Sequence, residues 1–179
     1  YFGHMWELYT LWALTPLLLT QMASATGVTL SPATLAWHSF LVIAIGAPGC
    51  VIGGWLSRSR GSLWVARLGL AGSVMLTLVF VAATQLEAGY GVLLALLALW
   101  SLLAVIDSPQ FSALAAGGTP VELQASALAM MNAFGFSLSL VSIALLTPLI
   151  AGHGSLLLLA LLPGPLLGLL ALSRRVDGA

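Results

Sequence analysis

The chain has 179 residues, of which 60% are hydrophobic and only 6% are charged, and its mean hydropathy is +1.11. Because a soluble domain carries about 25% charged residues, this composition excludes a soluble protein and predicts an integral membrane protein. The formal net charge is zero, so no basic surface is available for nucleic acid. The chain opens on Tyr1 rather than Met, already inside an apolar run, so we expect a fragment or one half of a larger protein.

Six apolar runs are long enough to cross a bilayer, whose hydrocarbon core of about 30 Å needs roughly 20 helical residues. The alternation of polar and apolar residues that a membrane β-barrel requires is absent from them. We therefore predict an all-α membrane protein, one bundle over residues 1–179 with six transmembrane helices. The predicted spans are 2–22, 35–56, 63–83, 91–114, 123–149 and 156–172.

The arginines predict how these spans are oriented, because positive residues that flank membrane spans stay on the cytoplasmic side. Arg58 and Arg60 lie between the second and third spans, and Arg174 and Arg175 follow the sixth. Six crossings place both pairs in the cytoplasm together with the N-terminal end and the C-terminus, and they place Glu87 outside. We expect a multi-pass protein of the cell's inner (plasma) membrane.

Two spans have compositions that predict their neighbours. The second contains Gly46, Gly49, Gly53 and Gly54, and small residues let helix backbones approach closely in lipid. It reads as an interface helix, although glycine is also simply common in membrane helices. The sixth span contains only Leu, Ala, Gly and Pro, which predicts a helix facing lipid. Most of the six tryptophans lie near span ends, which predicts an aromatic belt at the membrane surfaces.

Ionisable residues inside spans are the main functional candidates, because a charge at the bilayer centre costs at least about 2.5–3.5 kcal/mol. In the first span, His4 and Glu7 lie one helical turn apart, and Thr10 and Gln21 share the flank of Glu7. These four residues predict a site for a proton or a small polar solute. In the fifth span, Asn132 shares a face with Gly135, Ser139 and Ser142, which either pack against another helix by hydrogen bonds or line a solute path; we include Asn132 in the candidate site.

The fourth span carries Asp107 and Gln110 on either side of Ser108-Pro109. Since proline inside a helix removes a backbone hydrogen bond, we expect a bend there. With Arg58 and Arg60 at the same membrane face, these residues predict a cytoplasmic charge cluster that latches one conformation. The alternative is a simple helix cap, with Asp and Ser before a proline in the first turn and no switching role.

The first and fourth spans hold the acids, and they occupy equivalent places if the chain is two sets of three helices. Many transporters are built from such inverted repeats. An enzyme is not indicated, because His4 and Glu7 lack the second His of a zinc-protease helix and no lysine is present for a phosphate-binding loop. We expect no metal, no cofactor and no catalysis.

Several stretches resemble a known family. Residues 1–9, Tyr-Phe-Gly-His-Met-Trp-Glu-Leu-Tyr, resemble the opening of the seventh helix in a group of bacterial major facilitator superfamily transporters. Residues 107–114, 125–128 and 132–136 resemble their tenth and eleventh helices, and residues 53–61 resemble the loop between the second and third helices of each half. In that loop Ser57 replaces the usual Asp, and Arg60-Gly61 reverses the usual order.

The resemblance implies the C-terminal half of a twelve-helix transporter that exposes a midplane site to each side in turn. Its first and fourth spans would line the cavity, its second and fifth would face the other half, and its third and sixth would face lipid. The leading hypothesis is secondary transport of a small solute driven by a proton gradient, with Glu7, paired with His4, as the protonation or anchoring site. The alternative is a non-transporting membrane module that assembles with a partner or with a second copy.

Overall fold

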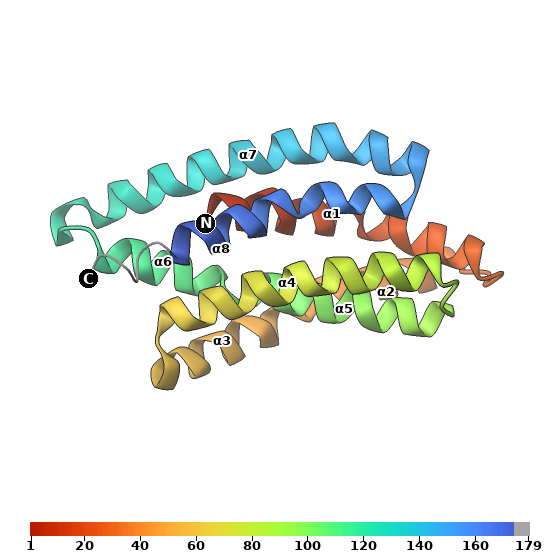
Figure 1. Cartoon of the computed structure of the whole chain (residues 1–179), viewed down its shortest axis with the longest axis horizontal. Coiled ribbons are helices and arrows are strands. Elements are labelled where there is room, and N and C mark those ends of the chain that lie inside the picture. The colour runs from red at the N-terminus through yellow and green to blue at the C-terminus, as the bar shows by residue number, and fades with distance from the viewer. Residues whose placement is uncertain (174–179) are drawn as a thin grey trace.

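The computed structural model describes residues 1–173; the predicted cytoplasmic pair Arg174 and Arg175 lies outside this part of the chain. All of its regular structure is helical (Figure 1). The elements are α1 (Phe2–Ala25), α2 (Pro32–Ala44), α3 (Gly46–Arg60), α4 (Ser62–Gln85), α5 (Tyr90–Ile106), α6 (Ser108–Gly117), η1 (Val121–Leu123), α7 (Gln124–His153), η2 (Ser155–Leu161) and α8 (Pro163–Ser173).

Five helical segments of the described chain are long and apolar enough to cross a membrane. They are α2 with α3, α4, α5 with α6, η1 with α7, and η2 with α8. The prediction of an all-α membrane protein is therefore confirmed. The first predicted span, α1, has 24 residues but is more polar than these five. It tolerates polar side chains because half of its residues, including His4, Glu7 and Thr10, are buried against its neighbours.

The helices form two layers. One layer runs in the order α7, α1, α5 and then α2 with α3, each in contact with the next. The second layer consists of α8 and α4, which contact each other and cover α1 and α5; in Figure 1 α8 lies in front of α1 and α4 in front of α5. α1 and α5 are thus the central helices. Their fully buried side chains Leu11, Leu14 and Trp100 pack with Phe80 of α4 in the apolar core.

Glycines allow the closest helix contacts. Gly46, Gly49 and Gly53 face α5, where a Cβ added at Gly53 would overlap the carbonyl oxygen of Ile106. The predicted close packing of the second span is thus observed, and its partner is the fourth span of the same bundle. Gly3 of α1 and Gly164 of α8 make a second backbone contact of this kind.

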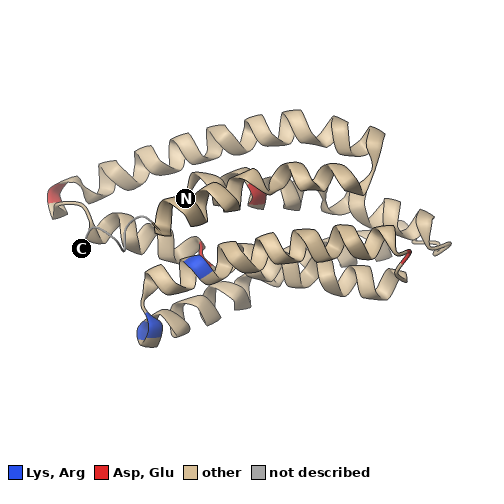
Figure 2. Ribbon diagram, viewed as in Figure 1, with Lys and Arg blue, Asp and Glu red and all other residues tan. Residues whose placement is uncertain are grey.

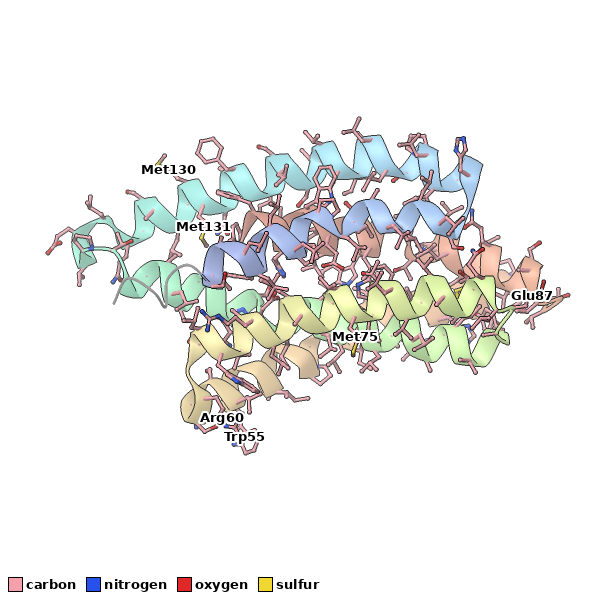
Figure 3. All side chains as sticks on the ribbon, viewed as in Figure 1. Trp55, Arg60, Met75, Glu87, Met130 and Met131 are labelled. Atoms are coloured by element: carbon pink, nitrogen blue, oxygen red, sulfur yellow. The ribbon has the colours of Figure 1, made fainter. Side chains whose placement is uncertain are left out.

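The exposed charged residues lie near the ends of the bundle, whereas Glu7 and Asp107 are buried inside it. Figure 2 shows arginine near the turn between α3 and α4 and acidic residues at both ends. We call the end where α3 meets α4, with Arg58 and Arg60, the arginine end, and the end where α4 meets α5 the Glu87 end. Figure 3 shows Trp55 and Arg60 pointing away from the bundle at the arginine end, far from Glu87. α1 begins and α8 ends at the arginine end, as six crossings predict.

The aromatic-belt prediction is wrong for Trp100, and two further tryptophans also pack against other helices. Trp37, Trp55 and Trp64 are exposed, but Trp100 is fully buried, and Trp6 and Trp12 are partly buried. The physical reason is that each of these three indole N–H groups has an acceptor on another helix. Trp6 donates to the carbonyl of Ala160 at 3.0 Å and Trp12 to Ser101 Oγ at 2.9 Å.

Candidate functional site

Glu7 lies inside the bundle, with 2% of its surface exposed. Two donors from two other helices reach the same carboxylate oxygen: Ser73 Oγ donates to Glu7 Oε1 at 2.5 Å and Trp100 Nε1 donates to it at 2.8 Å. Thr77, one turn beyond Ser73 on α4, lies 3.5 Å from that oxygen. No arginine or histidine of the described chain contacts the Glu7 carboxyl. The site is therefore an acid held by neutral donors in an apolar core.

His4 is paired with Asp107 rather than with Glu7. Its Nδ1 lies 2.9 Å from Asp107 Oδ1, and both side chains are almost fully buried. The other ring nitrogen, Nε2, lies 2.9 Å from Ser108 Oγ. The distance from His4 to Asp107 is short enough for a salt bridge, but the angles do not fit a hydrogen bond. Asp107 Oδ1 therefore accepts no hydrogen bond within residues 1–173. The pair joins α1 to the place where the fourth span breaks.

The break itself lies where the proline predicted it. α5 ends at Ile106, α6 begins at Ser108, and Asp107 is the residue between them. Asp107 occupies the N-cap position of α6, yet its side chain makes no capping hydrogen bond. The backbone N–H groups of Gln110 and Phe111 bond to the Asp107 carbonyl instead. The carboxylate is thus left to face His4.

Two aromatic rings cover His4 on the side of the arginine end. The Phe111 ring centroid lies 5.5 Å from that of His4, the Tyr1 centroid lies 6.2 Å from it, and the two covering rings are 6.0 Å apart. α1 starts at this end and α6 runs toward it, so Tyr1 and Phe111 lie between His4 and the arginine end.

The other residues of the predicted polar stripe contact α7. Thr10 Oγ1 and Ser142 Oγ are 2.6 Å apart and fully buried. Gln21 donates weakly to the Ile150 carbonyl at 3.4 Å, and Asn132 Oδ1 accepts from the Tyr1 hydroxyl at 2.8 Å. The predicted polar face of α7 therefore packs on α1, since Ser139 also donates to the carbonyl of Met5 at 2.7 Å.

The structure does not bring together the residues of the predicted cytoplasmic charge cluster, which are Arg58, Arg60, Asp107 and Gln110. Arg60 lies over the Trp64 ring, with 5.1 Å from its guanidinium carbon to the ring centroid, and Arg58 is exposed at the end of α3. Within residues 1–173 the ionic partner of Asp107 is His4. Gln110 is buried on α6, three residues after Asp107, and forms no side-chain hydrogen bond with Arg58 or Arg60.

A cavity of about 780 Å³ lies at the Glu87 end. Its polar lining comes from Gln21, Ser24, Thr26, Thr84, Glu87 and Ser155. Thr84 Oγ1 and Ser155 Oγ are 2.8 Å apart. The inner wall includes Phe80, whose ring centroid lies 5.7 Å from that of Trp100. The cavity thus reaches the side chain next to the indole that holds Glu7.

The two hydrogen-bond donors to Glu7, Ser73 and Trp100, were not predicted from the sequence. Ser73 and Thr77 are four residues apart in a span that is apolar apart from them and Arg67, which places both hydroxyls on one face of the helix. That spacing was a usable signal. Trp100 lies in the middle of the fourth span, and its central position argued against a surface belt.

Chemically, the Glu7 carboxyl can bind and release a proton or anchor a polar solute. Residues 1–173 contain no group of three or more His, Cys, Asp or Glu side chains that could hold a metal ion. Comparison with protein-family models, with curated proteins and with solved structures finds no match to this chain.

Proposed function

We propose that the chain is the C-terminal half of a secondary transporter of the major facilitator type, which moves a small solute across the membrane by alternating access and is driven by protons. The observation that carries this proposal is the buried Glu7 carboxyl, held by Ser73 and Trp100 from two other helices. An ionisable group kept at this cost inside a membrane bundle is a functional candidate by default. Catalysis forms no part of the proposal.

The helix contacts support two inverted sets of three helices. Exchanging the first span with the fourth, the second with the fifth and the third with the sixth leaves the pattern of neighbours unchanged. The contact of α1 with α7 becomes that of α5 with α2 and α3, and the contact of α7 with η2 becomes that of α3 with α4. Such internal symmetry is the architecture of many secondary transporters.

We place the arginine end in the cytoplasm and the Glu87 end outside, across the inner (plasma) membrane. The support is the positive-inside rule, since Arg58 and Arg60 flank the α3–α4 turn. The α2–α3 segment and α7 form the two edges of the larger layer, and both expose large apolar side chains such as Trp37, Val51, Phe134 and Leu140. We propose that these edges meet the other half of the transporter or a second copy of the chain.

The proposal is tested by uptake into proteoliposomes that contain the intact protein. A panel of labelled sugars, amino acids, organic acids and organic cations is offered with and without an imposed pH gradient. We expect at least one solute to accumulate only with the gradient, and Glu7→Gln to abolish this accumulation. Glu122→Gln, at an exposed acid, is the matched control and should accumulate normally. Unchanged uptake and unchanged pH dependence in Glu7→Gln would remove Glu7 from the mechanism.

The second candidate function is a membrane module that assembles without transporting. The exposed apolar edges favour assembly of some kind. In this case no solute of the panel accumulates. Crosslinks between copies should then join α2, α3 or α7 across a two-fold contact, whereas crosslinks through α8 would contradict this mode of assembly.

A further inference from the structure

We propose that Tyr1, His4, Asp107 and Phe111 form a gate that closes the route by which water and protons reach Glu7 from the arginine end. The inference rests on the proposed function, because it assumes that Glu7 exchanges protons with both sides of the membrane. This gate shares Asp107 with the predicted cytoplasmic charge cluster, but the partner of Asp107 is the buried His4 instead of the exposed Arg58 and Arg60. We refer to these four residues as the His4–Asp107 gate.

The order of the residues along the helices supports this role. α1 and α4 both run away from the arginine end, so Glu7 lies deeper than His4, by about 4.5 Å for three residues at 1.5 Å rise each. On α4, Gly69 packs against Asp107, since a Cβ added there would lie 2.8 Å from Asp107 Cβ, and Ser73 follows one turn deeper. The His4–Asp107 contact therefore lies between the arginine end and the pocket of Glu7.

The gate has two parts of different chemistry. The outer part is apolar and consists of the Tyr1 and Phe111 rings, which pack on His4. The inner part is the His4–Asp107 pair, with 3% and 1% of their surfaces exposed. Loss of one partner from such a buried pair is costly, because it leaves the polar group of the other partner buried without its contact. The pair thus ties α1 to the fourth span.

The break in the fourth span gives the gate a part that can move. The helix is interrupted between Ile106 and Ser108, and Asp107 does not cap the helix that follows. A change in direction of α6 at this point would carry Asp107 and Phe111 away from His4 together. α5, which holds Trp100 against Glu7, would keep its place. The pair can therefore open without dismantling the Glu7 site.

The two ends of the bundle differ in the way this proposal requires. On the Glu87 side, the cavity of about 780 Å³ reaches Phe80, which packs on the indole of Trp100. On the arginine side, the buried side chains of His4 and Asp107 lie between Glu7 and the end of the bundle. The cavity at the Glu87 end thus comes within one packed side chain, Phe80, of the Trp100–Glu7 contact, while Glu7 itself stays buried.

The test uses one reporter cysteine beside Glu7. Cys50, the single cysteine of the chain, is replaced by serine, and Ser73→Cys provides a thiol in the Glu7 pocket. The intact protein is placed in vesicles of both orientations and treated with a membrane-impermeant maleimide. We expect Asp107→Asn and His4→Gln each to speed labelling from the arginine side at least about tenfold, equivalent to about 1.4 kcal/mol in the opening equilibrium. Labelling from the Glu87 side should not change.

The controls separate the gate from general loosening and from the transport proposal. Ser142→Ala removes a buried contact between α7 and α1 away from the gate, so it should leave labelling from the arginine side unchanged. Equal labelling rates in the parent, Asp107→Asn and His4→Gln, with reaction from both sides, would overturn the gate and leave transport standing. A reporter that reacts from neither side in any variant would contradict the transport proposal itself. Because His4→Gln and Asp107→Asn alter different helices, a folding defect in one leaves the other as the test.

Discussion

The indole N–H of Trp100 donates a hydrogen bond of 2.8 Å to the carboxylate of Glu7, and both side chains are almost fully buried. This bond links the two central helices, α1 and α5, in the middle of an apolar core. Phe80, which lines the cavity at the Glu87 end, packs on the same indole.

Trp100→Phe should lower the free energy of unfolding by about 1–3 kcal/mol, because it leaves a buried acceptor with one donor fewer. The ring that fills the core is largely kept. The measurement is unfolding by denaturing detergent in mixed micelles. Trp55→Phe is the matched control, since Trp55 is 71% exposed, and should leave stability unchanged. Equal stability of the two variants would show that the bond to Glu7 contributes nothing.

Gly53→Ala should destabilise the bundle by about 1–3 kcal/mol, as expected for an overpacked contact. The added methyl group would overlap the carbonyl oxygen of Ile106, which belongs to a backbone that cannot rotate away. The neighbouring Gly54→Ala is the control, because a Cβ there meets nothing within 4 Å. Thermal unfolding in detergent compares the two. Similar losses in both variants would mean that α3 does not pack on α5 as described.

Thr10 and Ser142 should show a measurable coupling in a double-mutant cycle. The Ser142 hydroxyl also lies 2.9 Å from the carbonyl of Ser139, to which it donates, so Thr10 is the donor between the two hydroxyls. Thr10→Val and Ser142→Ala, alone and together, should give an interaction energy of about 0.6 kcal/mol and at most about 1.7, the range found for hydrogen bonds between membrane helices. A coupling of zero would indicate that α1 and α7 are held by apolar packing alone.

Thiol labelling should place the two ends of the bundle on opposite sides of the membrane. In the Cys50→Ser background, Ser59→Cys at the arginine end should react only from the cytoplasmic side. Gln85→Cys at the Glu87 end should react only from outside, because both positions are exposed. The two reporters serve as each other's control. Reaction of both from one side would exclude the crossing pattern, and the reverse assignment would exclude the positive-inside orientation.

Much of the fold could be predicted because hydrophobic length and glycine position are local properties of the sequence. The apolar runs gave the spans within a few residues, and Pro109 marked the break at Asp107. The stripe of Gly46, Gly49 and Gly53 indicated close packing, but its partner could not be named. Which helix fills a groove depends on the arrangement of all six spans.

The candidate site was predictable only in part. Glu7 and Asp107 stood out because lone acids in apolar spans are costly. The residues that contact these two acids did not stand out. His4 lies one turn from Glu7, which suggested that the two side chains pair along the same helix. The structure instead turns His4 toward Asp107, 103 positions further along the chain, and Glu7 toward Ser73 and Trp100. Such contacts follow from the way α1 is rotated against α4 and α5, which periodicity within α1 does not determine.

The proposed transport cycle requires that the Glu7 pocket is reached from both sides of the membrane, and a cysteine at Thr77, one turn beyond Ser73 on α4, tests this. In the Cys50→Ser background, with His4 and Asp107 intact, labelling with an impermeant maleimide is measured in vesicles of each orientation. Thr77→Cys should react from both sides, and faster from the Glu87 side where the cavity lies. Reaction from one side alone, or from neither, would contradict the proposed transport cycle.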